Sequence, residues 1–588
     1  MLYNQKYQDV PYPSTSLLDV DFSKYYSDAE HEFEVTHQIQ ASEEKEPDLS
    51  KAKFLNLIQN ISSILIRFRD GKYILSPYII WDGKRSFLPE DLDEEDVAFL
   101  GKILPKIQPN VLRAKVAESL WGKTKNRKYA IEAENAYMEL IQSDIPWHEQ
   151  DEYWGRILYI DKNIKGGKES EIKSIAAKKL LKGELDIFAI LWFCSNLFKE
   201  KDLSLELIDT IFSRLKEFFS RIGIYDYEEI KPALELIRRD NKEKADELID
   251  ILVNSFVKCA ESLVNSNATY AAIHYDSAIK YVQFISDKTK YDVERRKDEY
   301  LRRCREIRQL SFKDMRRISE NVDISRDVEK VQEYFSAIED KWKALFSFAA
   351  QTKFSDEEFV QLNEDVKKSI VQSSYTFLGG SYKTVDSYGR VIASDKGLQL
   401  EEPIELQDVF IHRRASYFRD MIDFRSAGVL QPALQCMIQK FEYPHEELYS
   451  VLQACANIPP DNIQAFVHGF YLMLKGDVFA AIHMLAPSFE AFIRSIFIKN
   501  QWKVTYLKDG KEQFLVLGSL IEDSLFVEKF GKEMQFQIYT VFCDPCGTNL
   551  RNDIAHGLYV PTEKTLSYAL YAIAFILNFL SYEKSLEG

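Results

Sequence analysis

The chain has 588 residues, of which 46% are hydrophobic and 29% are charged, a composition typical of globular proteins and unlike that of disordered ones. Its length exceeds what one hydrophobic core supports, so we expect about two to four domains. The formal net charge of −16 excludes a surface coated by nucleic acid, while a local basic groove remains compatible with it.

The seven cysteines form an odd and sparse set, which does not suit a disulfide framework and indicates a reducing compartment. Residues 1–18 lack a basic segment followed by an apolar run, so the sequence shows no secretion signal. We therefore expect a cytoplasmic protein.

The first part of the chain combines acidic runs with short apolar elements. Residues 1–50 are rich in turn-forming and acidic residues, and we expect a partly ordered, solvated lead-in without a function of its own. Apolar residues at helical spacing predict a helix over 51–68. Short apolar runs at 73–75 and 78–81, the second followed by an Asp82-Gly83 turn, predict two strands. The acidic cluster at 90–96 suits the positive end of the dipole of the next helix.

From about 97 to 320 the pattern is helical almost throughout, with short polar turns between the helices. The sequence Asn126-x-x-Tyr129-Ala130 recurs as Asn267-x-x-Tyr270-Ala271, and both copies are followed by small residues and a tyrosine at helical spacing. Stacked helical hairpins, as in tetratricopeptide arrays, produce such a repeat, whereas alanines also serve simply to let helices pack closely. We expect a solenoid-like helical array over 51–325, which offers a surface for a protein partner.

The most basic stretch, residues 290–317, carries eleven lysines and arginines against six carboxylates in a chain that is acidic overall. Cations along one helix face are typical of a track for the phosphate backbone of a nucleic acid. The same pattern also describes a solvated helix laced by ion pairs one turn apart, which is the interpretation that we favour. The candidate RNA-binding residues are Arg295, Arg296, Arg302, Arg303, Arg316 and Arg317.

Residues 326–460 form a second helical region, which is interrupted by a long, turn-rich loop near 377–400. Pro459-Pro460 ends this region, and 461–588 follow as helices with short connections, which predicts an antiparallel four-helix bundle. The fold class is therefore mainly α, with a small β-hairpin around Asp509-Gly510. Within the bundle the expected helices span 461–474, 478–499, 517–542 and the residues from 561 onward.

The last helix carries no charge over 565–582 and is rich in Leu, Ala, Ile and Phe. A membrane-spanning helix requires about twenty mainly apolar residues, and this segment also contains Ser567, Tyr568 and Asn578. We therefore expect a helix that is buried in the bundle or in a dimer interface, and no membrane attachment.

The helix over 478–499 is apolar nearly all round, but a polar stripe runs along it. His483, Glu490 and Arg494 lie on one face at helical spacing. Charges on a buried helix require partners, and Glu490 and Arg494, one turn apart, are able to satisfy each other. The stripe is therefore either a structural ion pair or a support for a neighbouring functional site.

The segment Asn549-Leu550-Arg551-Asn552-Asp553-Ile554-Ala555-His556-Gly557 has the densest concentration of chemically useful side chains. Guanidinium binds phosphate oxygens in a bidentate way, and imidazole transfers protons near neutral pH. On a continuous helix Arg551 and His556 diverge by about 140°, while Asn552 and His556 share a face. Spacing alone thus favours a helix end with a surface histidine and a C-terminal glycine, unless Arg551 serves a site shared with a second molecule.

The bundle with Arg-Asn-x-x-x-His-Gly near its end resembles a bacterial family of uncharacterised domains with an RNxxxHG signature, over about 466–588. It is also similar to the wider HEPN superfamily of four-helix domains, in which an Arg-x(4–6)-His motif forms a metal-independent ribonuclease site, usually across a dimer. Arg551 and His556 fit Arg-x4-His, with the polar Asn552 after the arginine, and the run 485–494 also looks like that family.

The resemblance implies a metal-independent RNA endonuclease that works as a homodimer, uses no cofactor and acts on RNA. His556 would act as general acid or base on the ribose 2′-hydroxyl or the leaving oxygen, Arg551 would stabilise charge on the phosphate, and Asn552 would orient the phosphate or the imidazole. The polar stripe would support this site. With the helical array as sensor or scaffold, a role in bacterial defence or toxin action follows by analogy. The alternative is a non-catalytic interaction or dimerisation protein whose bundle binds RNA or a nucleotide.

Cys543-Asp544-Pro545-Cys546 precedes the motif and has the spacing of half a zinc site or of a redox pair. A second cysteine pair at matching spacing is absent from the sequence, so we expect a structural or incidental role for these two thiols.

Overall fold

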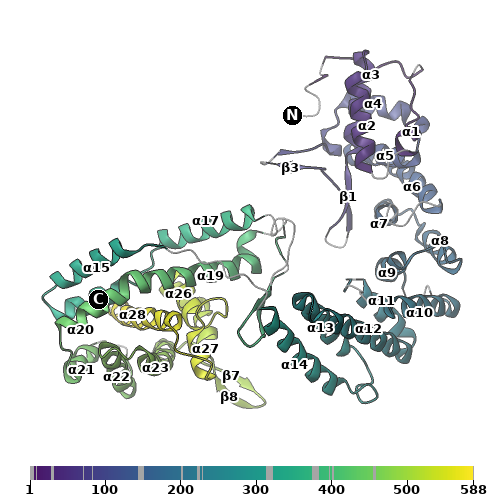
Figure 1. The fold of residues 1–588 in the computed structure, drawn as a ribbon. Helices are drawn as coiled ribbons and strands as arrows, with labels where there is room; N and C mark the ends of the chain where they lie inside the picture. Colours follow the sequence, from purple (N-terminus) through teal and green to yellow (C-terminus); the bar gives the residue numbers. More distant parts are fainter. Residues whose placement is uncertain are drawn as a thin grey trace. The chain divides into compact units, whose positions relative to one another are not determined.

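The structure, a computed structural model, describes residues 6–7, 9–16, 18–27, 32–69, 72–81, 84–143, 151–199, 203–221, 226–227, 229–312, 322–373, 383–395, 397–399, 403–454 and 458–586. These residues are mainly helical, and their strands pair only as two-stranded antiparallel hairpins (Figure 1), which confirms the prediction of a mainly α protein. The chain divides into two compact units, Met1–Ile307 and Arg308–Gly588, called here the N-terminal and the C-terminal unit.

The N-terminal unit begins with short helices and hairpins and continues as a series of longer helices. The elements of its first part are α1 (Ser23–Ser27), α2 (Glu32–Lys45), α3 (Leu49–Ser62), β1 (Leu65–Arg69), β2 (Lys72–Ser76), β3 (Ile80–Trp81), β4 (Lys84–Arg85), η1 (Pro89–Asp91), α4 (Glu94–Ile103) and η2 (Leu104–Lys106). The helices that follow are α5 (Asn110–Thr124), α6 (Arg127–Gln142), α7 (Asp151–Ile164), α8 (Glu169–Leu181), α9 (Ile187–Asn196), α10 (Leu205–Phe219), α11 (Ile230–Asp240), α12 (Lys242–Leu263), α13 (Ala268–Val282) and α14 (Val293–Ser311).

The start of the chain contributes to the core. Phe22 and, in α2, Val35 and Ile39 are buried in the core, and α2 packs on α3, so the expected solvated lead-in contributes to the core. The helix predicted over 51–68 is too long, because α3 ends at Ser62 and β1 then pairs with β2. Ile64 and Ile66 are buried while the residue between them is not, and this alternation suits a strand.

The strand predicted over 73–75 lies within β2, and β3 covers the last two residues of the strand predicted over 78–81. The turn predicted at Asp82-Gly83 lies outside the described residues. Both hairpins are short, and helices form most of the unit.

The repeated motif of the sequence marks the second helix of a helical hairpin in both places. Asn126 and Asn267 are the N-caps of α6 and α13, and their side chains accept hydrogen bonds from the backbone N of Lys128 (3.0 Å) and of Tyr270 (3.1 Å). α6 packs on α5, and α13 packs on α12. The alanines that follow each cap are buried, which lets the paired helices approach closely.

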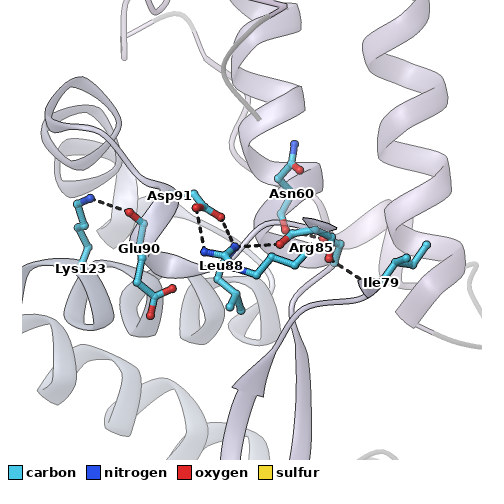
Figure 2. Close-up of polar contacts among 9 residues, drawn as sticks. Asn60, Ile79, Arg85, Leu88, Glu90, Asp91 and Lys123 are labelled. Atoms are coloured by element: carbon cyan, nitrogen blue, oxygen red, sulfur yellow. Dashed lines mark hydrogen bonds and ion pairs between the residues drawn. The ribbon is translucent and has the colours of Figure 1, made fainter. Parts of the chain in front are cut away.

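Figure 2 shows how the chain passes from the β3–β4 hairpin toward α4. The guanidinium of Arg85 donates to both carboxylate oxygens of Asp91, at 2.6 and 3.1 Å. The same carboxylate accepts from the backbone N of Leu88 at 2.8 Å, and Lys123 Nζ of α5 donates to the carbonyl of Glu90 at 2.8 Å. The carboxylate of Asp91 therefore holds β4 to η1, and the backbone carbonyl of Glu90 holds α5 to it.

The C-terminal unit contains the rest of the helices and two further hairpins. Its first part consists of α15 (Ser325–Ala337), α16 (Lys341–Ala350), α17 (Asp356–Gln372), β5 (Lys383–Val385), β6 (Val391–Ser394), η5 (Ile404–Leu406), α19 (Asp408–Arg425), the π-helical η6 (Ser426–Leu430), α20 (Gln431–Lys440) and α21 (His445–Gln453). Its second part consists of η7 (Pro460–Asn462), α22 (Ile463–Leu474), α23 (Val478–Lys499), β7 (Thr505–Lys508), β8 (Lys511–Phe514), α24 (Leu517–Ile521), α25 (Ser524–Phe530), α26 (Lys532–Phe542), α27 (Leu550–Ala555) and α28 (Glu563–Leu586).

α28 is the central helix of the C-terminal unit. It packs against α16, α19, α22 and α23, and each residue from 569 to 580 is at most 9% exposed. By length and composition α23 and α28 are apolar enough to cross a membrane, but 56% and 72% of their most apolar windows are buried within the described part of the chain. Such burial is typical of core helices in soluble proteins, and it agrees with the predicted buried last helix.

The elements around the motif agree with the sequence in part. The predicted helix over 478–499 is α23, and Asp477 caps it by accepting a hydrogen bond from the backbone N of Ala480 at 2.9 Å. The predicted hairpin is β7–β8, with Asp509 and Gly510 at positive φ in its turn. The segment predicted as helical over 517–542 consists of three helices, because Asp523 begins a second helix and Gly531, at a φ of 87°, ends it.

Candidate functional site

A short, tightly anchored loop presents α27. The backbone N of Thr548 donates to the carbonyl of Thr540 at 2.9 Å, and the hydroxyl of Thr548 donates to the carbonyl of Val541 at 2.5 Å. A Cβ on Gly547 would clash with the Thr540 carbonyl, so the loop can lie against the end of α26 only with glycine here. Asn549 then starts α27 in the left-handed conformation, at a φ of 50°.

Arg551 of α27 shares a carboxylate with Arg494 of α23. Arg551 Nε donates to Glu490 Oε2 at 2.6 Å, and Arg494 Nη2 donates to Glu490 Oε1 at 2.7 Å. Glu490 is 7% exposed, so both ion pairs lie in partly desolvated surroundings. We call these three residues the arginine–glutamate cluster. Two guanidinium groups face one carboxylate, which leaves the cluster with one net positive charge.

A network of amides holds the cluster from the motif side. Asn552 Oδ1 accepts from Arg551 Nη1 at 3.1 Å. Asn552 Nδ2 donates to the carbonyl of Cys543 at 3.2 Å and to Asn549 Oδ1 at 2.8 Å. Asn549 in turn donates to Asp553 Oδ1 at 2.9 Å, and burial raises the pKa of the Asp553 carboxyl. Asn552 therefore orients the guanidinium of Arg551 and ties it to the loop before α27.

Arg551 and Asn552 line an open pocket of about 240 Å³ next to this network. The remaining lining residues are Val516, Leu517, Gly518, Ser519, Glu522, Tyr539 and Cys543. Burial raises the pKa of the Tyr539 hydroxyl, which keeps it protonated and able to donate a hydrogen bond at neutral pH. The pocket thus offers a guanidinium, an amide and hydroxyls to a polar ligand, together with one unfavourable carboxylate, Glu522, if that ligand is an anion.

The two histidines of the predicted site lie elsewhere. His556 follows the last residue of α27, is exposed, and does not line the pocket. Gly557 comes next with a φ of 66°, the conformation in which helices commonly end. His483 packs against the rings of Phe479 and Tyr559, with centroids 4.4 and 5.5 Å away, and its Nδ1 lies 2.8 Å from the Phe479 carbonyl.

The structure therefore brings together four of the six residues predicted for the site. Arg551, Asn552, Glu490 and Arg494 form one connected group, while His483 belongs to an aromatic cluster two turns along α23. The sequence-based interpretation missed Glu522 and Tyr539 in the pocket. No local signal marks these two residues, because Glu522 reaches the pocket from the turn after α24 and Tyr539 reaches it from α26. Only the tertiary packing brings them together.

The two cysteines before α27 are protonated thiols at neutral pH. Burial raises the pKa of Cys543 to about 12 and that of Cys546 to about 11. A thiolate is the form that binds metals and exchanges disulfides, so neither group is activated for such chemistry. In the part of the chain that the structure describes, no three His, Cys, Asp or Glu residues are grouped so as to hold a metal ion.

Most of the candidate RNA-binding arginines on α14 are engaged with carboxylates. The pairs are Arg295 with Asp292 and Glu299, Arg296 with Asp250, and Arg303 with Glu261 and Glu306. Arg302 is exposed and makes no ion pair with any described residue. Arg316 and Arg317 lie outside the described residues. This arrangement is that of a helix laced by ion pairs, the interpretation that the sequence favoured.

The comparisons with known proteins concern a different part of the chain. Residues 17–173 match a family described as a domain of unknown function (DUF7380). This region lies within the N-terminal unit and does not include α27. No curated protein matches the chain, and no solved structure matches it.

Proposed function

We propose that the C-terminal unit is a metal-independent RNA endonuclease of the HEPN type, built on an antiparallel four-helix bundle. The observation that carries the proposal is the arginine–glutamate cluster, which fixes the guanidinium of Arg551 at the rim of an open pocket. Guanidinium at such a rim suits the phosphate of RNA, and the net positive charge of the cluster favours an anion. An exposed histidine, His556, follows on the same short helix.

The proposed reaction cuts RNA by internal transfer of the phosphate. His556 takes the proton of a ribose 2′-hydroxyl while the 2′-oxygen attacks the phosphorus. The bond from phosphorus to the 5′-oxygen breaks, and that oxygen takes up a proton from the solvent or from an imidazolium. The products are a 2′,3′-cyclic phosphate and a 5′-hydroxyl. Arg551 stabilises the negative charge that develops on the non-bridging oxygens, and Asn552 holds Arg551 in place.

We place the two reactive residues of one site on two chains. Arg551 lines the pocket and His556 does not, so a phosphate held at Arg551 needs an imidazole from another source. A symmetric dimer supplies it, since Arg551 of one protomer then faces the histidine of its partner, and the reverse holds at the second site. The N-terminal unit, as a solenoid-like sensor or scaffold, would present a surface to a protein partner, in a cytoplasmic system of bacterial defence or toxin action.

Cleavage of defined RNAs by the purified chain tests this function. We expect cleavage that persists in EDTA, leaves cyclic phosphate ends, and falls by about 10²- to 10⁴-fold in His556→Ala, the range that general acid–base catalysis contributes. A matched control is His483→Ala, which removes a histidine from the same unit but not from the proposed reaction. The nuclease would be refuted if the wild-type chain and His556→Ala cleaved RNA at equal rates and if expression of either protein in cells left growth unaffected.

A non-catalytic protein is the second candidate, and one observation favours it. Arg551 is already paired with a buried carboxylate, as a structural arginine would be, and His556 does not line the pocket. In that case the bundle serves dimerisation or binds RNA or a nucleotide, and the array binds a partner protein. RNA that binds equally well to the wild-type chain and to His556→Ala, without being cut by either, would support this candidate.

A further inference from the structure

The β7–β8 hairpin is the most exposed element next to the candidate site. Every residue of β8 is exposed, as are three of the four in β7. Among the described elements, no helix makes extensive contact with the hairpin, which extends from the helices of the C-terminal unit in Figure 1. An isolated two-stranded hairpin is only marginally stable in water. Such exposure is typical of an element that contacts a ligand or a partner molecule.

The pairing register gives the hairpin two chemically different faces. Tyr506 lies opposite Gln513, and Lys508 lies opposite Lys511, so these four side chains share one face. The other face carries Leu507, which is 74% exposed, and Phe514. The first face is aromatic and basic, and the second carries these two apolar side chains beside Thr505 and the carboxylate of Glu512.

The basic face is unneutralised. From 494 to 514, the end of β8, the chain has five lysines and arginines and two carboxylates, Asp509 and Glu512, in a protein whose net charge is −16. Lys503, Lys508 and Lys511 make no ion pair with any residue in the described part of the chain. The hydroxyl of Tyr506 donates to Gln513 Oε1 at 2.7 Å, and this pair lies on the same face as the Lys508–Lys511 pair nearer the turn. Aromatic rings for stacking, set among cations, are the combination that binds single-stranded nucleic acids.

A chain of contacts links the hairpin to Arg551. The ring of Phe514 lies 5.0 Å from the guanidinium carbon of Arg494, and Arg494 also donates to the carbonyl of Leu515 at 3.2 Å. Arg494 and Arg551 share the carboxylate of Glu490. The base of the hairpin is therefore fixed to the same cluster that holds Arg551 at the pocket.

We propose that the β7–β8 hairpin is a binding arm for single-stranded RNA, which contacts the phosphates through Lys508 and Lys511 and stacks a base on Tyr506. The proposal rests on the proposed function for the choice of RNA as the polyanion. The arm would hold the strand on the Arg551 side of the pocket. Leu507, on the other face and 74% exposed, remains available for contact with protein.

Fluorescence anisotropy with a labelled oligouridine of about 20 nucleotides measures this binding, in the full chain carrying His556→Ala so that no strand is cut. We expect Lys508→Glu/Lys511→Glu to weaken binding by roughly tenfold and to reduce the slope of log K against log salt by about 1.4. Lys529→Glu/Lys532→Glu, the same charge change at exposed lysines of α25 and α26, is the matched control and should leave the affinity unchanged. Tyr506→Ala should weaken binding by roughly tenfold and Tyr506→Phe should restore it, because stacking requires only the ring.

Three results overturn the proposal. One is the absence of any binding of oligouridine to the His556→Ala chain. Another is an affinity that the double charge reversal leaves unchanged. The last is a loss of RNA affinity in Leu507→Ser together with a change in molar mass by light scattering, which would make the hairpin a protein interface. The nuclease and the binding arm fail separately. If the hairpin binds RNA but the wild-type chain never cuts it, the nuclease alone is refuted. If Lys508→Glu/Lys511→Glu leaves cleavage by the otherwise wild-type chain unchanged, the binding arm alone is refuted.

Discussion

At the scale of single residues, Glu490 determines the geometry of the candidate site because its carboxylate serves two guanidinium groups. It is 7% exposed, so its charge is stabilised chiefly by these partners. Removing that charge leaves two guanidinium groups facing each other in partly buried surroundings. The position of Arg551 in the pocket therefore depends on a residue 61 positions away in the sequence.

We expect Glu490→Gln to destabilise the C-terminal unit by about 3 kcal/mol, the usual consequence of breaking a buried ion pair by removing one partner. Thermal unfolding measures the loss, and RNA cleavage should fall with it. Glu528→Gln, at an exposed site on α25, is the control and should leave both properties unchanged. If Glu490→Gln changed neither the melting temperature nor the rate of RNA cleavage, the arginine–glutamate cluster would not be what positions Arg551.

Glu522 is the one carboxylate in the lining of the pocket, and it opposes the binding of a polyanion. Glu522→Gln should therefore raise the affinity for RNA by about two- to fivefold at low salt, and less at high salt, where the repulsion is screened. Anisotropy titrations at two ionic strengths measure the effect. An unchanged or weaker affinity in Glu522→Gln would mean that RNA does not approach this pocket.

In the N-terminal unit, burial raises the pKa of Glu134, which lies beside Asp161 and pairs with Lys168 at 3.0 Å. Because the folded state holds this proton more tightly than the unfolded state does, the resulting stability is present at low pH and is lost as pH rises above the ordinary glutamate value of 4.5. Glu134→Gln removes the cost of ionisation. Its melting temperature relative to wild type should therefore rise between about pH 4 and about pH 7, and a flat or falling difference would contradict the assignment.

At the scale of elements, the sequence predicts the helices and turns whose formation depends on residues that are close together in the chain. The apolar pattern of 478–499 is sufficient to predict α23, and Asp509-Gly510 is sufficient to predict the β7–β8 hairpin. Local spacing predicts the residues of β1 as the end of a helix, whereas the strand is stabilised by pairing with β2 and by burial of Ile66. The arginine–glutamate cluster joins α23 to α27, and such a tertiary contact has no signature in the spacing of either helix.

The loop before α27 provides a prediction at this scale. Gly547→Ala should destabilise the C-terminal unit by about 1–3 kcal/mol, the cost of overpacking, because the new Cβ would clash with the backbone of Thr540. Gly518→Ala is the matched control, since its Cβ would meet its nearest neighbour, Cys543 Sγ, at 3.8 Å. Thermal unfolding of the two variants checks this. Equal melting temperatures would mean that the loop shifts at little cost and does not fix α27.

At the scale of the whole molecule, each unit has a hydrophobic core of its own. The N-terminal unit contains the region similar to the domain of unknown function, and the C-terminal unit contains the candidate site. Within one chain Arg551 lines the pocket and His556 does not, so a single chain does not present both residues to the same phosphate. The central claim is therefore that a working site takes one residue from each of two chains.

Mixing two inactive variants tests this claim most directly. Arg551→Ala and His556→Ala are each expected to be inactive in RNA cleavage with EDTA present. After they are mixed in equal amounts and allowed to exchange subunits, about half of the dimers are mixed, and each of these has one site with both native residues, so about a quarter of the wild-type activity should return. If the wild-type chain cleaves RNA but the mixture of the two variants does not, Arg551 and His556 of one site lie on the same chain, and the account is contradicted.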